Sequence, residues 1–271
     1  MPVRVTIGGL SAIAERPAVE RCAPLLFIHG YFGRGVAFER MMTWFASRGH
    51  ACYAPDLPGH GDSPAERPLG RLSIHDYTDA AARVATALGN PVVIGHSMGG
   101  LIAQLLATRD LARALVLLAP APPRGIPVLS VRLALAQLHY MPAILMSRTV
   151  HPGRGDLQAL VTNRVPAAEC DIVLDMLVPD SGRAGREMSL LGVPVDAARV
   201  RAPVLVISGD EDLFIPISRC RLVAARYNGD FRAAPGRGHM LIIAPGFEEL
   251  CSWISEWLAS RGLADEGRIS A

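Results

Sequence analysis

A serine, a histidine and several carboxylates occupy positions in this sequence where they could carry out nucleophilic catalysis. Ser97 lies in the pentapeptide GHSMG (residues 95–99), which fits the pattern G-x-S-x-G. The apolar run 92–94 before it predicts a buried strand, and residues 101–107 after it predict a helix. A serine on so sharp a strand-to-helix turn presents its hydroxyl above the end of a sheet. The pentapeptide alone is a weak signal in a chain with 26 glycines, but this context favours a nucleophile over a plain turn.

A serine hydroxyl needs a neighbouring base to become nucleophilic. Among the 8 histidines, His239 lies in the loop between the last expected strand and the last helix, on the same side as Ser97. His29 and His60 also follow strands, but the glycines after them indicate turns. We therefore expect His239 to be the base.

The base in turn needs an acid that orients it, and three acids compete in one loop. Asp210, Glu211 and Asp212 directly follow the apolar run 204–207, which predicts a strand. We expect Asp212 to be the orienting acid, with Asp210 as the second candidate. Two buried carboxylates so close would repel each other, so the other acids are expected to cap the turn or face solvent.

The elements that must position these residues alternate as strand and helix from residue 25 to residue 118, and again from residue 204. This alternation predicts an α/β fold with a mostly parallel, doubly wound sheet, preceded by a hairpin within residues 2–14 at the sheet edge. Residues 121–198 interrupt it without a clear strand and with helical spacing over 126–150 and 166–178. We expect a core domain of residues 1–120 and 199–271 and a helical cap of residues 121–198.

A cap over the carboxyl ends of the strands would cover the ligand site, because ligands of open α/β sheets bind there. The cap carries four methionines, a residue type that adapts to irregular apolar ligands, although packing against the core is the favoured explanation because buried methionine is common. The pocket residues that we expect are His29, Phe32, Tyr140, Met141, Met146, His151, Phe214 and Met240.

Composition excludes several classes of function. The net charge of +2 argues against a nucleic-acid partner, and all 27 basic residues are arginine, which excludes Schiff-base, pyridoxal-phosphate and P-loop lysine chemistry. No acidic, histidine or cysteine set has metal-ligand spacing, and no dinucleotide fingerprint occurs, so we expect neither a metal nor a cofactor.

The 5 cysteines are far apart and form no C-x-x-C pair, which favours reduced thiols. No signal peptide and no membrane-spanning apolar run are found, so we expect a cytoplasmic protein without a membrane contact. The expected partner is a small-molecule substrate, and the expected assembly is a monomer or homodimer.

The chain order Ser97, Asp212, His239 resembles that of the α/β-hydrolase family, in particular its capped esterases, haloperoxidase-like enzymes and C–C hydrolases. The segments that carry the resemblance are His29-Gly30, DLPGHGDS (56–63), GHSMGG (95–100), the late G-x-x-D (209–212) and Gly238-His239.

This resemblance implies a nucleophile, an acid and a base at these three positions, and an oxyanion hole from the backbone N–H groups of Tyr31 and Met98. It also implies that loop 56–63 is structural rather than a source of general acids.

The function that we expect is hydrolysis of a carboxylic ester or thioester of a small, largely apolar substrate through an acyl-enzyme. A C–C bond hydrolase or a lyase with the same triad remains open, and so does a small-molecule receptor that retains the triad. Haloalkane dehalogenases and epoxide hydrolases of this family have Asp where this chain has Ser97, which argues against both.

Overall fold

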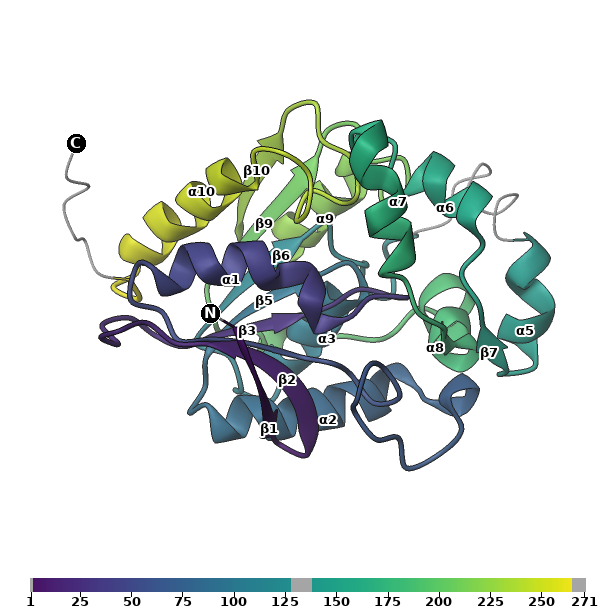
Figure 1. The fold of residues 1–271 in the computed structure, drawn as a ribbon, viewed down its shortest axis with the longest axis horizontal. Coiled ribbons are helices and arrows are strands. Elements are labelled where there is room, and N and C mark those ends of the chain that lie inside the picture. The colour runs from purple at the N-terminus through teal and green to yellow at the C-terminus, as the bar shows by residue number, and fades with distance from the viewer. Residues whose placement is uncertain (1, 128–137, 265–271) are drawn as a thin grey trace.

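The computed structural model describes residues 2–127 and 138–264 of the chain. A mostly parallel, eight-stranded sheet lies at its centre (Figure 1). In spatial order the strands are β1 (Val3–Ile7), β2 (Leu10–Glu15), β4 (Cys52–Pro55), β3 (Leu25–Ile28), β5 (Val92–His96), β6 (Ala114–Leu118), β9 (Val204–Gly209) and β10 (Asp230–Ala234). Strands β1 and β2 form an antiparallel hairpin, β2 pairs antiparallel with β4, and the strands from β4 to β10 run parallel. The predicted doubly wound sheet and the predicted edge hairpin are both confirmed.

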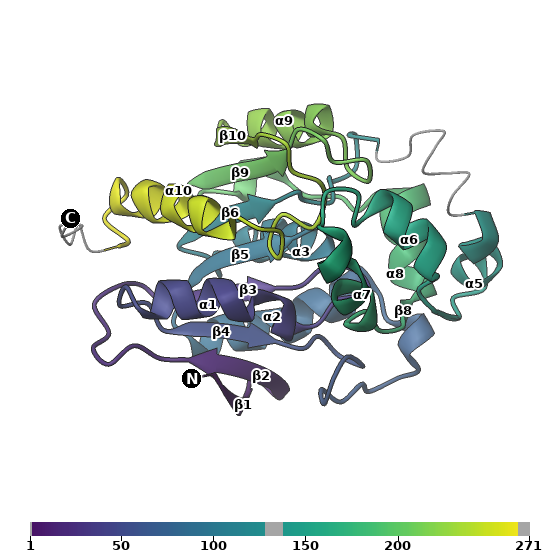
Figure 2. The same cartoon turned by 45° about the horizontal axis from the view of Figure 1, so that its top comes forward.

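Helices cover the two faces of this sheet, as Figure 2 shows. Helices α2 (Ile74–Ala87), α3 (Met98–Ala107) and α9 (Ile217–Arg226) pack on one face, and α1 (Glu39–Ala46) and α10 (Phe247–Ala259) on the other. Successive strand residues serve opposite faces: Leu26 and Ile28 pack with the first group of helices, Leu25 and Phe27 with the second. Burial on both faces explains why the central strands are continuous apolar runs in the sequence.

The segment between β6 and β9 is a group of short elements beyond the strand ends (Figure 1). Its elements are α5 (Met141–Leu145), β7 (Thr149–Val150), α6 (Arg154–Leu160), α7 (Ala167–Asp175), β8 (Asp180–Ser181) and α8 (Gly182–Arg186), with short 3-10 and π turns at Leu138–Tyr140, Glu187–Leu191 and Ala197–Arg199. Two further 3-10 turns, Gly35–Phe38 and Leu69–Arg71, lie in core loops.

The expectation that this segment contains no strand was wrong, because β7 and β8 pair antiparallel. Two-residue strands leave no periodic pattern that a sequence could reveal. Of the helix expected over 126–150, the part from 128 to 137 lies outside the described residues, and within the described part α5 is helical.

This segment shares a small apolar core with two loops of the main domain. Leu157, Leu160 and Val173 of the segment pack in one cluster with Phe32 and Met240 of the core loops. The segment therefore packs on the loops that follow the strands. We call it the cap, while its role as a lid and the domain limits at residues 120 and 199 stay predictions.

Candidate active site

Ser97 lies at the sharp junction between strand β5 and helix α3. Its backbone has φ 53° and ψ −118°, a conformation that costs a non-glycine residue energy and persists only where the surroundings enforce it. Three hydrogen bonds enforce it. The Ser97 N–H donates to the Leu118 carbonyl at 3.0 Å, and the Ser97 carbonyl accepts the N–H groups of Ala121 at 2.8 Å and Gly100 at 2.9 Å. Backbone strain that the surroundings hold in place is typical of a functional residue.

Glycines surround this turn because the chain passes too close for a side chain. A Cβ at Gly99 would collide with the Ile28 carbonyl of β3, and a Cβ at Gly95 would collide with the Gly99 carbonyl. At Gly30, in the loop after β3, a Cβ would lie 3.0 Å from the Ser97 Cβ. The loop after β3 thus packs directly against the serine.

His239 and Asp212, from the loops after β10 and β9, form a buried pair. The His239 Nδ1 lies 2.8 Å from the Asp212 Oδ2, and both side chains are almost fully shielded from solvent. The other Asp212 oxygen, Oδ1, accepts the N–H groups of Phe214 and Ile215 at 2.8 Å each. Because Asp212 is held at both oxygens, it fixes the orientation of the imidazole.

The other two acids of this loop, Asp210 and Glu211, contact groups other than His239. Asp210 is exposed and its Oδ1 accepts the Gly236 N–H at 2.7 Å. Glu211 forms an ion pair with Arg164 of the cap. Of the three candidates, Asp212 is the one that the structure places against His239.

His96, next to the serine, holds the His239 loop. Its Nε2 lies 2.9 Å from the His239 carbonyl, so this nitrogen carries the hydrogen. Burial and the nearby His239 lower the pKa of His96 to about 3. A neutral donor therefore positions the loop of His239, a role that the sequence did not indicate.

Of the residues expected to supply backbone donors, Met98 directly follows Ser97 and Tyr31 lies in the loop after β3 that packs against it. Met98 is the first residue of α3, where N–H groups have no partner within the helix. Within residues 2–127 and 138–264, no hydrogen bond uses the N–H of Met98 or of Tyr31. Two unpaired donors beside a serine can stabilise negative charge that develops on a bound carbonyl oxygen.

Ser97 and His239 open into one apolar cavity beneath the cap. Among the described residues its lining contains no acid and no arginine. The larger side chains of the lining are His29, Tyr31, Phe32, His96, Tyr140, Ile144, Val150, Leu157, Leu160, Val161, Leu177, Met188, Phe214, Ile215, His239, Met240 and Ile242.

Five of the predicted pocket residues lie in this lining, namely His29, Phe32, Tyr140, Phe214 and Met240.

Met141, Met146 and His151 lie outside the lining, contrary to expectation. Met146 is 59% exposed and His151 is exposed, while Met141 packs in the cap core. Helix α6 instead supplies Leu157 and Leu160, whose helical spacing together with Val161 was the signal that could have found them.

His29 lines the cavity but its ring is fully engaged. Its Nδ1 lies 2.9 Å from the Gly30 carbonyl, and its Nε2 accepts the Leu57 N–H at 3.0 Å. Burial and the neighbouring His60 lower the pKa of His29 to about 4. His29 is thus a neutral structural link between two loops, with no nitrogen left for proton transfer.

Loop 56–63 makes structural contacts. The Asp56 Oδ1 accepts the Gly35 N–H at 2.8 Å, its Oδ2 lies 3.2 Å from Arg4, and the Ser63 hydroxyl donates to the Asp56 carbonyl at 2.6 Å. His60 contacts Asp180 of the cap at 3.1 Å. This loop holds the strand end rather than a substrate.

In the part of the chain that the structure describes, no group of three or more acidic, histidine or cysteine side chains could hold a metal ion. All five cysteines are free thiols. None of the described helices has both the length and the apolar character that a membrane crossing requires.

Comparisons with known proteins agree with this fold. The model of the alpha/beta hydrolase family matches residues 25–248, most of the chain, and the protein belongs to this family. The chain is 26% identical over 277 residues to a monoacylglycerol lipase of Mycolicibacterium smegmatis, covering 94% of this chain and 95% of that protein. It is also 29% identical to a pimeloyl-acyl-carrier-protein methyl ester esterase of Neisseria meningitidis, over 70% of this chain and 75% of the relative.

Among solved structures, a thermophilic esterase from Thermogutta terrifontis superposes with a TM-score of 0.72, at 19% identity, covering 98% of this chain and all of the esterase. This likeness shows the fold. The family and the named relatives together support an ester-cleaving α/β-hydrolase enzyme.

Proposed function

We propose that this chain is a serine hydrolase that cleaves carboxylic esters or thioesters of small, largely apolar substrates through an acyl-enzyme. Ser97 is the nucleophile, His239 the general base and Asp212 the orienting acid. The observation that carries this proposal is the buried Asp212–His239 contact of 2.8 Å beside a strained Ser97, both facing one apolar cavity.

The mechanism follows from the hydrogen bonds. Asp212 accepts the hydrogen on the His239 Nδ1, which leaves the Nε2 free to take the Ser97 hydroxyl proton. The Ser97 oxygen then attacks the substrate carbonyl carbon, and the oxyanion accepts hydrogen bonds from the N–H groups of Met98 and Tyr31. His239 returns the proton to the leaving alcohol or thiol, and a water activated by the same imidazole hydrolyses the acyl-enzyme.

The lining of the cavity favours a neutral, apolar substrate. The described lining carries no charged acid or arginine side chain, and burying an unpaired charge there would be costly. The relatives named monoacylglycerol lipase and methyl ester esterase support an ester as the bond that is cleaved.

An assay with p-nitrophenyl acetate and p-nitrophenyl butyrate tests this function on the wild type and Ser97→Ala. We expect turnover by the wild type and a loss of about 10³-fold or more in the variant, because the nucleophile is gone. A wild type that releases no more nitrophenol than Ser97→Ala would remove the esterase assignment and favour a receptor.

A further inference from the structure

We propose that Asp180 of the cap is a positioning residue for catalysis, which fixes the loop that supplies the Tyr31 N–H to the oxyanion. The proposal rests on the proposed function, since it concerns the oxyanion donor of that same site. Asp180 lies in strand β8, and nothing in its sequence neighbourhood resembles a catalytic motif.

Asp180 is completely buried and contacts polar groups from three distant parts of the chain and from its neighbour Ser181. Its Oδ2 accepts the Phe32 N–H at 2.8 Å and forms an ion pair with the His60 Nε2 at 3.1 Å. Its Oδ1 accepts the Tyr77 hydroxyl at 2.7 Å and the Ser181 N–H at 2.6 Å. A buried carboxylate with this many donors is an acceptor that no neutral side chain can replace fully.

The surroundings keep Asp180 ionised. The His60 Nδ1 lies 3.2 Å from the Pro58 carbonyl, and its Nε2 lies 3.1 Å from the Asp180 Oδ2. Burial alone would lower the pKa of His60, but the contact with Asp180 raises it above its ordinary value, which favours the protonated imidazole. Burial by itself would raise the pKa of Asp180, but the charge of His60 and the hydrogen bonds hold it below its ordinary value. Asp180 is therefore a fixed carboxylate acceptor beside the loop after β3, with the His60 imidazole in contact with it.

That loop has a backbone conformation that needs outside support. Phe32 has φ 65°, a left-handed conformation that is unfavourable for an aromatic residue. Besides the bond to Asp180, the Phe32 carbonyl accepts the Val178 N–H at 2.9 Å, and the Tyr31 hydroxyl donates to the Ser181 carbonyl at 2.8 Å. Because the cap holds both the N–H and the carbonyl of Phe32, it also fixes the backbone of the preceding Tyr31.

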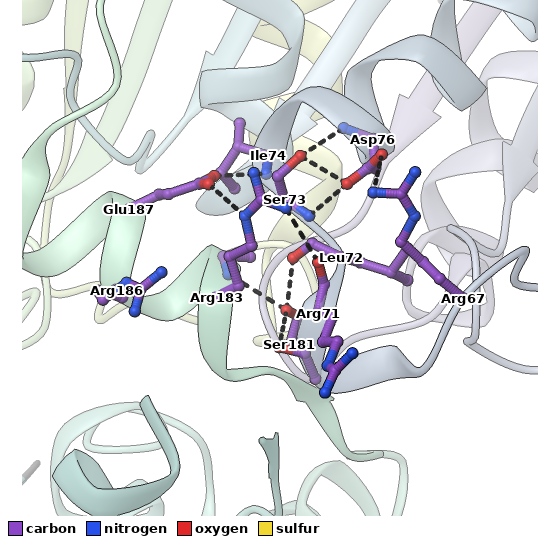
Figure 3. Close-up of polar contacts among 12 residues, drawn as sticks. Arg67, Arg71, Leu72, Ser73, Ile74, Asp76, Ser181, Arg183, Arg186 and Glu187 are labelled. Atoms are coloured by element: carbon purple, nitrogen blue, oxygen red, sulfur yellow. Dashed lines mark hydrogen bonds and ion pairs between the residues drawn. The ribbon is translucent and has the colours of Figure 1, made fainter. Parts of the chain in front are cut away.

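The cap itself is attached to the core by other contacts, which Figure 3 shows. The Ser181 hydroxyl donates to the Leu72 carbonyl at 2.5 Å, and Glu187, which also pairs with Arg183 within the cap, accepts the Ile74 N–H at 2.8 Å. These contacts lie on helix α2 and the turn before it. A substitution at Asp180 should therefore release the loop after β3 while the cap stays docked.

The experiment compares Asp180→Asn with two matched variants. In Asp180→Asn one carboxylate oxygen becomes an NH2 group, which faces donors in either orientation of the amide. Tyr77→Phe removes one partner of the same carboxylate but leaves its contact with Phe32. Glu187→Gln neutralises another cap carboxylate that accepts a backbone N–H, away from the loop after β3.

The quantity to compare is kcat for p-nitrophenyl butyrate, expressed per active site as titrated with a fluorophosphonate. In Asp180→Asn we expect kcat to fall about 10- to 100-fold, while KM changes less than about threefold. In Tyr77→Phe and Glu187→Gln, kcat should stay within about threefold of the wild type, even where the melting temperature falls. A second variant, Tyr31→Phe, loses the contact with Ser181 without a buried charge change and should lower kcat by about three- to tenfold.

Two results would overturn the proposal. In one, kcat per titrated site in Asp180→Asn and in Tyr31→Phe stays within about twofold of the wild type. In the other, Tyr77→Phe loses as much kcat as Asp180→Asn, which is the result expected of a merely structural residue. A wild type without turnover above Ser97→Ala would instead defeat the proposed function, so the two failures are distinguishable.

Discussion

Replacement of Asp212 by asparagine should disable catalysis while it leaves the fold intact, because the two ends of this carboxylate face different groups. Its Oδ1 accepts two backbone N–H groups, from Phe214 and Ile215, so an oxygen must remain at that position. The amide NH2 group is then forced toward the His239 Nδ1, 2.8 Å away. A donor at that place requires the Nδ1 to be an acceptor, which puts the imidazole hydrogen on the Nε2.

An imidazole in this tautomer cannot take a proton from Ser97. The comparable substitution in a serine protease lowers kcat by about 10⁴-fold, and we expect a loss of about 10³- to 10⁴-fold here. The assay is kcat/KM on p-nitrophenyl butyrate, with the melting temperature recorded for each variant. Because the backbone contacts of Asp212 persist, the melting temperature should change by only a few degrees.

Asp210→Asn is the matched control. Asp210 is exposed and contacts the Gly236 N–H, which an amide oxygen also accepts, so activity should stay within about twofold of the wild type. A loss of less than about tenfold in Asp212→Asn, or a large loss in Asp210→Asn, would refute the assignment of the acid.

Two further predictions concern the cavity and the buried histidines. Leu160→Trp should fill the cavity and lower kcat/KM for p-nitrophenyl butyrate about tenfold more than for p-nitrophenyl acetate. Met146→Trp, at an exposed position outside the lining, should leave kcat/KM for both esters unchanged. Equal effects of the two variants would contradict the cavity assignment. In the folded protein His29 and His96 have pKa values of about 4 and about 3, so both stay neutral near pH 5. In the unfolded chain the same histidines have a pKa of about 6.5 and take up protons there. Acid should therefore destabilise the fold. Between about pH 7 and pH 5 each of the two histidines should lower the free energy of unfolding by about 2 kcal/mol, while His60, whose pKa is raised, acts in the opposite direction. A free energy of unfolding that rises toward pH 5 in urea titrations would contradict the neutral burial of His29 and His96.

The sheet was predictable because its strands are buried on both faces. Residues Leu25–Ile28 and Ala114–Leu118 are continuous apolar runs, and the helices between strands carry apolar faces at helical spacing. The start of α2 was also readable, since Ser73 and Asp76 form the reciprocal hydrogen bonds of a capping box. Local patterns of this kind depend on nearby residues only.

The cap was predictable as a helical insertion but not in its details. Its helices are short, and β7 and β8 have two residues each, so neither leaves a period long enough to recognise. Methionine content suggested Met141 and Met146 as pocket residues, yet which face of a short helix turns to the cavity depends on how the cap docks.

Of the candidate site, motif order placed Ser97, Asp212 and His239, since each follows a strand at the same edge of the sheet. The contacts of His96 with the His239 loop and of Asp180 with Phe32 join residues more than 100 positions apart. No local pattern encodes such contacts, and they became visible only when the loops were in place.

Trapping of the acyl-enzyme tests the central claim most directly. The wild type is mixed with p-nitrophenyl butyrate, quenched in acid during turnover and examined by mass spectrometry of the intact and digested protein. We expect one butyryl group, on the peptide that contains Ser97, and none on Ser97→Ala. Steady turnover by Ser97→Ala, or a butyryl group on another residue of the active wild type, would contradict the assignment of Ser97 as the nucleophile.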